Sequence, residues 1–329
     1  DWEVPTSGGI ARARARLGSG PLEYVFGQVA QPVAEIDTRG AWLGSRRLVS
    51  IDGMVWDLPD SAENEAVFGR TTGAAFAQAR VVTLVESGSH CAIGARIGPA
   101  AGKGSGEQSA AMALVELLDA DMLCLADRLF YGFDLWCAAA ATGAGLLWRI
   151  KDGIELPVVA DLGDGSYTSL VFAKGTAAGI RVRLLAAARA GRDVSAGGQA
   201  RLVRVVEYYV NGRTPAPAGR ELICLITNLT DPADVPAAAL AAAYHDRWEH
   251  EGANAQIKTG LRGPGRVLRS RSPDMVRQEI YGYLLAHYAI TALICKAATE
   301  TDTDPDRVRF VKAVRLARAH VSDPEAFSP

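Results

Sequence analysis

The order of strand-like and helix-like runs between residues 46 and 151 constrains the fold more than any other feature of this chain. Three runs rich in β-branched residues come first: "RRLVSIDGMVW", "ARVVTLVESG" and "HCAIGARIG". A helix-like run, "EQSAAMALVELLDA", follows, and "MLCLAD", "GFDLWCAAAATG" and "LLWRIK" then alternate as strand, helix and strand. This β-β-β-α-β-α-β order predicts an α/β domain with a mixed sheet flanked by helices.

The rest of the sequence predicts four parts. Residues 1–36 read as helical and basic, and residues 37–151 as the first part of the α/β core. Residues 152–230 hold runs such as "GIRVRLLAAAR" and "RLVRVVEYYV" between Gly, Pro and Asp, which predicts an all-β insertion. Residues 231–329 return to helical patterns and are expected to complete the core.

Charge and cysteine content narrow the class of protein. A formal net charge of −2 gives no overall attraction to nucleic acid, so any basic surface has to be local. The five cysteines are scattered without a CxxC pair, which is typical of reduced core thiols in a cytoplasmic protein. The longest apolar run, "YLLAHYAITALIC", is too short and too interrupted to predict a membrane span.

Two aspartates occupy positions that need a reason. Asp52 interrupts the strand-like run "LVSIDGMVW", where aspartate is disfavoured, and a capping or turn role competes there with a functional one. Asp127 ends the apolar run "MLCLAD"; ligands bind at the carboxyl ends of strands in open α/β sheets, although an aspartate here could also cap the next turn. Asp57 and Asp60 lie beside Pro59 and are more simply turn formers.

The stretch "YHDRWEHEGANAQIK" predicts one continuous helix with a functional face. Four side chains fall within an arc of about 60° and span about 21 Å, at about 100° and 1.5 Å per residue: Tyr244, Arg247, Glu251 and Lys258. The alternative is an amphipathic surface helix with an Arg247–Glu251 pair, which would contribute only about a few tenths of a kcal/mol. An acid between two cations and beside aromatic residues on one stripe favours the functional role.

A basic stretch follows and predicts a local anion site. It begins at Lys258 in "KTGLRGPGRVLRSRSPDMVRQ", and no acid lies between Glu251 and Asp274. Its arginines are Arg262, Arg266, Arg269, Arg271 and Arg277. Arginine among Gly and Ser suits phosphate binding, through bidentate hydrogen bonds and exposed backbone N–H groups.

Three carboxylates on separate elements, beside an anion site, predict a hard-cation site for phosphoryl transfer. Oxygen ligands favour Mg²⁺ or Mn²⁺, and two such ions can activate an attacking oxygen and stabilise a leaving one. The five histidines show neither HExxH nor paired ligand spacing, which disfavours a zinc hydrolase.

The spacing Y-x2-R-x3-E-x6-K resembles the signature of the DDE transposases of bacterial insertion sequences in the IS-four family. The resemblance covers nearly the whole chain. "IDGMVWDLPDSAEN…FG" is similar to the segment of the family's first aspartate, "LADRLFYGFDLW" to that of the second, and "LRSRSPDMVRQEIYGYLLAHYA" to the stretch after the signature. It implies a ribonuclease H-like catalytic core with a β-rich insertion before the last acid.

The resemblance also implies roles and partners. Asp52, Asp127 and Glu251 would be the catalytic ligands of two Mg²⁺ or Mn²⁺ ions. The DNA phosphates would contact Tyr244, Arg247, Lys258, Arg262, Arg266, Arg269 and Arg271. The implied reaction is cut-and-paste transposition, in which a nicked element end forms a hairpin that is opened and joined to a target. A homodimer on paired ends of double-stranded DNA is implied, in the bacterial cytoplasm and without membrane or small-molecule partners.

Two departures from the family pattern bear on activity. Leu129 stands where relatives commonly have glycine, which would stiffen the turn beside Asp127. The chain is expected to start partway through a helical region that helps to recognise element ends, with "GGIARARARLG" as its last part. Three alternatives stay open: a stand-alone Mg²⁺-dependent nuclease, a DNA-binding remnant of a decayed element, and a sugar-processing hydrolase that uses Asp52 and Glu251.

Overall fold

The computed structural model describes residues 6–102, 104–211, 220–245, 247–263, 265 and 267–321. The chain divides into two compact units, and each is built from separate stretches of sequence. The first unit consists of Asp1–Ala41, Gly53–Ala110 and Glu249–Pro329. The second unit consists of Trp42–Asp52 and Ala111–Trp248.

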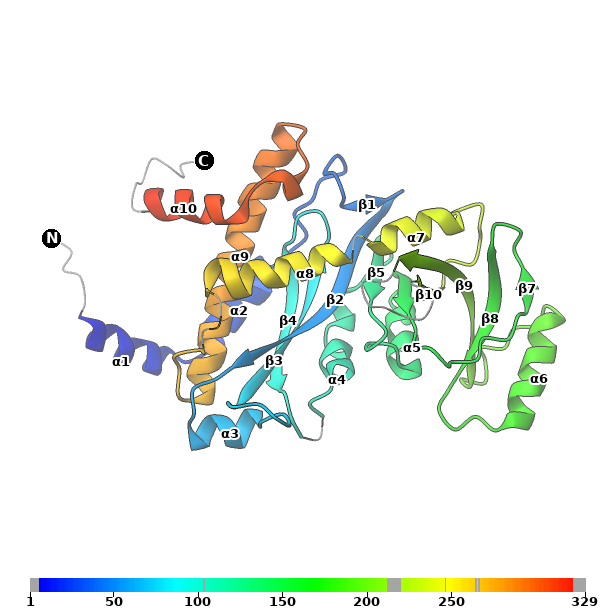
Figure 1. Ribbon diagram of the computed structural model, residues 1–329, viewed down its shortest axis with the longest axis horizontal. Helices are drawn as coiled ribbons and strands as arrows, with labels where there is room; N and C mark the ends of the chain where they lie inside the picture. Colours follow the sequence, from blue (N-terminus) through cyan, green and yellow to red (C-terminus); the bar gives the residue numbers. More distant parts are fainter. Residues whose placement is uncertain are drawn as a thin grey trace. The chain divides into compact units, whose positions relative to one another are not determined.

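The first unit contains most of the helices (Figure 1). Its elements are α1 Ser7–Leu17, α2 Gly20–Val29, the second part of β2 (Arg46–Asp57), α3 Ala62–Phe68, β3 Gln78–Glu86, β4 Ala92–Pro99, most of α4 (Glu107–Met112) and of α8 (Trp248–Ala255), the π-helical η2 Gln256–Leu261, α9 Pro273–Glu300, the 3₁₀ turn η3 Pro305–Arg307 and α10 Phe310–His320. Its strands hydrogen-bond in the order β4-β3-β2.

β3 and β4 form the hairpin that the sequence predicts, with Val82 opposite Arg96 in an antiparallel register. The turn between them needs glycine. Gly88 has a φ of 76°, and a Cβ added there would lie 2.8 Å from the backbone nitrogen of Ala41. The backbone of Ala41 therefore approaches this turn so closely that no side chain fits at position 88.

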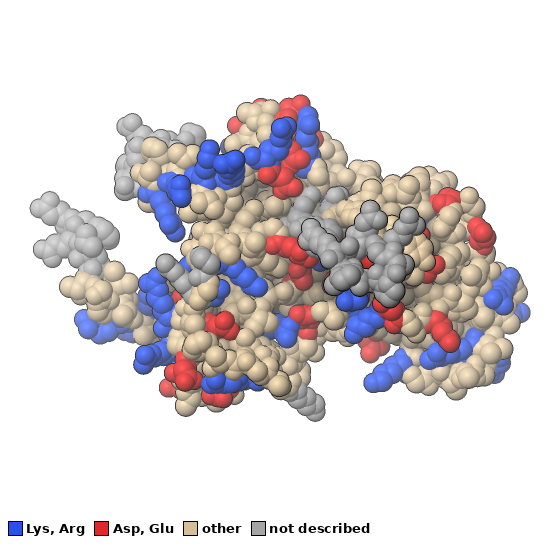
Figure 2. Space-filling view, viewed as in Figure 1, with Lys and Arg blue, Asp and Glu red and all other residues tan. Residues whose placement is uncertain are grey.

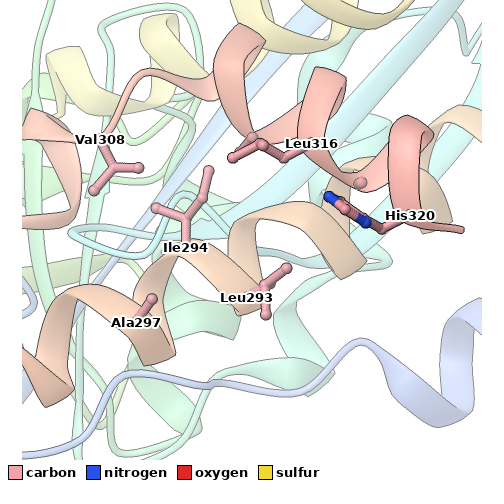
Figure 3. A pocket seen from close by; sticks show the side chains of 8 residues that line it. Leu293, Ile294, Ala297, Val308, Leu316 and His320 are labelled. Carbon is pink, nitrogen blue, oxygen red and sulfur yellow. The ribbon is translucent and has the colours of Figure 1, made fainter. Parts of the chain in front are cut away.

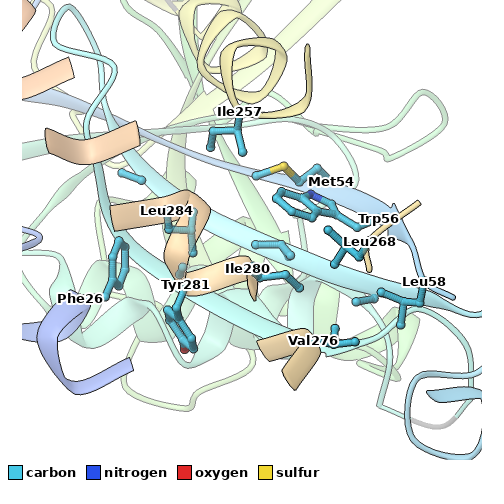
Figure 4. Packing of buried hydrophobic residues seen from close by; sticks show 14 of the residues in the cluster. Phe26, Met54, Trp56, Leu58, Ile257, Leu268, Val276, Ile280, Tyr281 and Leu284 are labelled. Carbon is cyan, nitrogen blue, oxygen red and sulfur yellow. The ribbon is translucent and has the colours of Figure 1, made fainter. Parts of the chain in front are cut away.

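The core of the first unit forms where α9 packs against β2 and its neighbours (Figure 4). Val276, Ile280 and Leu284 recur every four residues and therefore share one face of α9. They join a buried cluster that includes Met54 and Trp56 of β2. By length and composition alone α9 could cross a membrane, but core helices pass the same test. The buried stripe identifies α9 as a core helix.

The second unit holds the larger part of the sheet. Its elements are β1 Trp42–Leu43, the first part of β2, η1 Val115–Leu117, β5 Met122–Ala126, α5 Phe133–Ala141, β6 Gly145–Arg149, β7 Ala160–Asp161, β8 Ser166–Phe172, α6 Ala178–Arg189, β9 Ala200–Asn211, β10 Arg220–Thr227 and α7 Ala237–His245. The strand order is β2-β5-β6-β10-β9-β8-β7. β2, β5 and β6 are parallel, and the pairs from β6 onward are antiparallel.

The core of the second unit is the contact between α7 and this sheet. Leu240 of α7 packs in one cluster with Leu48, Leu123 and Leu147, which lie on β2, β5 and β6. Runs such as "MLCLA" are entirely buried, as parallel strands covered on both faces require. The predicted α/β fold class, with a mixed sheet flanked by helices, is confirmed.

One part of the fold prediction was wrong, because the insertion between residues 152 and 230 is not all-β. The run "GIRVRLLAAAR" lies within helix α6. Its first residues alternate like a strand, but Leu184, Leu185, Ala187 and Ala188 pack with Leu170 of β8, which is the spacing of one helix face. The alanine-rich end also favours helix. The predicted helix at "EQSAAMALVELLDA" is likewise shorter, ending at Met112 before η1.

Candidate active site

Asp52 and Asp127 occupy equivalent places on two neighbouring parallel strands of the second unit. The register of β2 and β5 places Ile51 beside Ala126, so Asp52 and Asp127 are the next residues along each strand. In-register side chains of parallel neighbours point to the same face, about 4.8 Å apart in the backbone. Both side chains are half-buried. The structure therefore brings these two predicted acids together.

The backbone around each aspartate explains why the chain tolerates it. Asp127 follows the last residue of β5; its Oδ1 accepts a hydrogen bond from the Arg128 N–H at 2.5 Å, and its C=O accepts one from the Phe130 N–H at 2.9 Å. Leu129 lies in this turn and is 51% exposed, so its side chain is directed away from the core. Asp52 lies in the middle of β2, where that strand passes from the second unit to the first.

Tyr244 and Arg247 also belong to the second unit, and both are buried. Tyr244, at the end of α7, is 4% exposed, and Arg247 in the following turn is 6% exposed. The Arg247 guanidinium lies 5.9 Å from the centre of the Tyr244 ring, a cation–π contact. Burial raises the pKa of the Tyr244 hydroxyl well above its ordinary value. The Arg247 charge opposes this rise and the Asp127 charge adds to it, so Tyr244 lies within the field of the Asp127 carboxylate.

The start of α7 is held in place by an ion pair between a fully buried arginine and a partly exposed aspartate. The Ala237 N–H donates to Asp164 Oδ2 at 2.8 Å, and the same carboxylate oxygen accepts from Arg204 Nη2 at 2.5 Å. Arg204 is fully buried on β9 and also donates to the C=O of Val235 at 2.7 Å. A carboxylate at a helix N-terminus is favourable, because it satisfies a free N–H and complements the helix dipole. This pair fixes where α7 begins, and α7 carries Tyr244.

The predicted continuous helix through Tyr244 and Lys258 was wrong. α7 ends at His245, Arg247 lies in a turn, and α8 begins at Trp248. The Arg247 N–H bonds to the Tyr244 C=O at 3.2 Å, a spacing of three residues. After Ala255 the chain becomes π-helical, and the Arg262 N–H reaches the C=O of Ile257, five residues back. A fixed rotation of about 100° per residue therefore does not apply over this stretch. Tyr244 and Arg247 are buried in the second unit and do not lie on an exposed helix face.

Glu251 and Lys258 belong to the first unit. Glu251 lies on α8 and is exposed, whereas Lys258 lies in η2 and is half-buried. Between them Ala253 and Ile257 enter the buried cluster that contains Trp56 (Figure 4). The apolar side of α8 and η2 is thus fixed on the core, and Glu251 faces solvent.

Polar contacts made by buried side chains fix α8 further. His250 is fully buried, and its Nε2 lies 2.9 Å from Thr83 Oγ1 on β3. Gln256 bridges two histidines, with Nε2 3.0 Å from His90 Nδ1 and Oε1 3.0 Å from His287 Nε2. Burial, followed by the nearby His90, lowers the pKa of His287 to about 3, so His287 is neutral at physiological pH. His250 and His287 thus have side-chain partners within the first unit.

We expect Thr83→Val to destabilise the protein by about 1–3 kcal/mol, because His250 Nε2 would lose its partner in a site closed to water. Thr259→Val is the matched control, since the Thr259 hydroxyl is exposed and donates to the C=O of Ala255, four residues back. Urea unfolding of both variants measures the difference. Equal stability of the two variants would contradict the assigned role of the Thr83–His250 contact.

Hydrogen bonds to its backbone hold the predicted basic loop in place. Glu279 accepts the N–H groups of Arg269 and Ser270 at 3.2 and 3.1 Å, and Ser61 Oγ donates to the C=O of Arg271 at 2.7 Å. The side chains of Arg269 and Arg271 are exposed. Arg262 is half-buried, and its guanidinium lies 5.2 Å from the centre of the Trp56 ring. Arg266 lies outside the described residues.

The carboxylates fit a hard cation in their chemistry. Asp52 and Asp127 supply oxygen donors on one face of the second unit, and Glu251 supplies an exposed carboxylate on the first. Neither unit by itself, over the residues that the structure describes, gathers three His, Cys, Asp or Glu side chains into a metal site. The aspartate pair is therefore the part of the predicted ligand set that the fold assembles.

A comparison with known protein families shows the family to which this chain belongs. Residues 43–289 match the family described as "Transposase DDE domain". The chain belongs to this family. The matched region of the DDE domain begins at β1 and ends within α9, so it contains Asp52, Asp127, Glu251 and Lys258, whereas α1, α2 and α10 lie outside it.

Two curated relatives of this DDE domain protein are named as a transposase and a putative transposase. The chain is 28% identical over 296 residues to the transposase InsG for insertion sequence element IS4 of Escherichia coli K12, covering 88% of this chain and 61% of that relative. It is 29% identical over 147 residues to the putative transposase InsZ of the same organism, covering 43% and 48%. The chain thus spans less than two thirds of the length of these relatives.

Among solved structures, the piggyBac transposase synaptic complex with hairpin DNA is similar at a TM-score of 0.45 and 10% identity, covering 84% of this chain and 54% of that one.

Sequence reasoning missed the residues that position the DDE domain helices. Arg204 was read only as part of a β-rich run, yet an arginine at the centre of "RLVRVV" is a signal, because a buried strand position rarely holds an unpaired charge. Thr83 and Gln256 gave no such signal, since their partners are distant in sequence.

Proposed function

We propose that this chain catalyses metal-dependent cut-and-paste transposition of an insertion sequence. Membership of the DDE transposase family supports the reaction class. The observation that supports the residue assignment is the pairing of Asp52 and Asp127 on β2 and β5, because two carboxylates held on one face of a sheet are costly unless they bind a cation.

Asp52, Asp127 and Glu251 are the proposed ligands. Two Mg²⁺ or Mn²⁺ ions held there would activate the attacking oxygen and stabilise the leaving oxygen of a phosphodiester. Their carboxylate oxygens match the preference of hard cations, and none of the three needs to donate a proton for this role.

The cations near these acids are the proposed phosphate contacts. Arg247 is buried beside Tyr244, so a phosphate that it contacts would be held in a site of reduced dielectric. Tyr244 keeps its proton because its pKa is raised, and it can therefore donate a hydrogen bond. Lys258 and the arginines at 262, 266, 269 and 271 would extend the contacts along the DNA backbone.

In the proposed sequence of reactions, the two steps that use water each hydrolyse one phosphodiester bond, and the two transesterifications leave the number of phosphodiester bonds unchanged. Water attacks a phosphorus atom at the element's end, one P–O bond forms as another breaks, and a 3′-hydroxyl is released. That hydroxyl attacks the opposite strand and forms a hairpin, with a new hydroxyl as the leaving group. Water opens the hairpin, and the regenerated 3′-hydroxyl attacks the target strand. The proposed substrate is double-stranded DNA, bound by a homodimer in the bacterial cytoplasm.

We expect strand nicking and joining to stop when divalent cations are removed. The assay uses labelled duplexes that carry the element's ends, a target plasmid, and Mg²⁺ or Mn²⁺ with EDTA-treated protein as the control. Nicking without joining would identify a stand-alone nuclease instead. Binding without nicking in either metal would indicate a decayed remnant and would overturn the proposal.

A further inference from the structure

Helix α10 lies outside the region that matches the family, and its sequence "FVKAVRLARAH" has two faces. Phe310 and Val314 are buried against α9 and η2. Lys312, Arg315 and Arg318 are all exposed. At about 100° per residue these three cations occupy an arc of about 120° beside the buried face, and they span about 9 Å along the axis.

These cations have no acidic partner within the described residues. No ion pair or hydrogen bond joins Lys312, Arg315 or Arg318 to another described side chain. The acids of the preceding loop are engaged elsewhere: Asp302 pairs with Arg39 at 2.9 Å, and Asp306 lies 2.9 Å from His90 Nε2. Three unpaired cations on one helix face repel one another, and an anionic partner relieves this repulsion.

The cationic face continues onto other basic elements of the first unit. Figure 2 shows Lys and Arg side chains gathered over α10 and at α1. Arg318 and Arg14 of α1 line the same surface hollow, of about 350 Å³. α10 also rests on η2, where a Cβ added to Gly260 would lie 3.0 Å from the Phe310 ring. The cations of α10 thus belong to the same unit as Lys258 and adjoin the element that carries it.

The other side of α10 is chemically distinct. Figure 3 shows an apolar groove of about 410 Å³ between α9 and α10, lined by Leu293, Ile294 and Leu316 among others. The single Phe, Tyr or Trp residue of α10, Phe310, is buried. The cationic face therefore offers charge without an aromatic platform, and single-stranded nucleic acids are bound largely through stacking on such platforms.

We propose that the exposed face of α10 binds the phosphate backbone of double-stranded DNA through Lys312, Arg315 and Arg318. The three charges would contact phosphates outside the proposed catalytic site and without base specificity. This inference rests on the proposed function for the identity of the substrate, but its own test measures binding alone.

The test compares the affinity of the full chain for a 30-base-pair duplex of arbitrary sequence, by fluorescence anisotropy across a series of salt concentrations. The variant is Lys312→Gln/Arg315→Gln/Arg318→Gln. The matched control is Lys174→Gln/Arg183→Gln/Arg192→Gln, which removes one lysine and two arginines that are equally exposed on the second unit. The α10 variant should lower the slope of log K against log salt by about 2.7, at about 0.9 for each lost phosphate contact.

A direct readout does not depend on the variants. Duplex DNA should protect Lys312, and not Lys174, from acetylation detected by mass spectrometry. Equal slopes for the α10 variant and the wild type, with Lys312 unprotected, would overturn the proposal. Equal loss of binding in both triple variants would do the same, because the effect would then be one of net charge. Stronger competition by single-stranded than by duplex DNA would exclude the assigned partner.

The outcomes separate this inference from the proposed function. At saturating DNA the α10 variant should nick at the wild-type rate, because saturation offsets the weaker binding and none of its three cations is a proposed catalytic ligand. If the wild type binds duplex DNA and the α10 variant lowers the salt slope, but the wild type never nicks, the proposed function is wrong and the α10 proposal is supported. If the wild type nicks but the salt slope of the α10 variant equals that of the wild type, only the α10 proposal is wrong.

Discussion

Replacement of Glu251 by glutamine is expected to lower the rate of strand nicking by about 10³-fold or more, because a metal ligand contributes several kcal/mol of transition-state stabilisation. Asp52→Asn and Asp127→Asn should have effects of the same size. Any two of these substitutions combined should cost little more than one, because residues that act as a unit are not additive. Single-turnover cleavage of an end-bearing duplex measures each rate.

The acid variants need two controls. Asp134→Asn removes an exposed carboxylate on α5, a few residues after Asp127, and should nick at the wild-type rate. Duplex affinity should not fall in any of the acid variants, since each loses a negative charge. A Glu251→Gln protein that nicks as fast as the Asp134→Asn control would remove Glu251 from the proposed ligand set.

Replacement of Arg204 by methionine is expected to destabilise the protein by about 1–3 kcal/mol, because a buried acceptor loses its hydrogen-bond donor. Arg204 is fully buried, and the substitution removes its hydrogen bonds to the C=O of Val235 and to Asp164. Arg46→Met is the matched control, because Arg46 pairs with Asp234 at 2.7 Å with greater exposure, and such pairs contribute only about 0–1 kcal/mol. Urea unfolding measures both variants.

The same pair predicts how stability depends on pH. Partial burial raises the pKa of Asp164, but hydrogen bonds from Ser166 and the Ala237 N–H, together with the Arg204 charge, lower it to about 2 from an ordinary value of 3.8. A lowered folded-state pKa contributes stability that is present above pH 3.8 and lost as the pH falls toward 2. Arg204→Met/Asp164→Asn should show less acid sensitivity than the wild type, and unchanged acid sensitivity would contradict the assignment.

The positions of the two aspartates could be predicted because the relevant pattern is local. Asp127 ends an apolar run, and Asp52 interrupts a strand-like run. Each pattern predicts the position of a carboxylate on a strand of the sheet. Both positions have side chains whose direction follows from the period of a strand, which depends on the backbone alone. Their pairing in register needed only the additional rule that parallel strands of one unit align.

The helix through Tyr244 and Lys258 could not be predicted in the same way. Placing the four side chains on one face assumed a single helical period, whereas α7 ends at His245 and the chain becomes π-helical after Ala255. Tyr244 packs with Leu48 and Leu123, and His250 bonds to Thr83, 167 residues away. Local propensity is worth less than such packing, so the tertiary contacts override a regular helix.

By itself the sequence determined the elements whose periodicity is uninterrupted, the basic character of the loop after Lys258, and the resemblance to the DDE transposases that the family match then confirmed. The tertiary structure alone decided that α6 is a helix, that Tyr244 and Arg247 are buried, and that Arg204 reaches Asp164 across 40 residues. The physical reason is the range of the interactions. Backbone sterics and side-chain period act between neighbours in sequence, whereas burial and charge pairing depend on which distant segments the fold brings together.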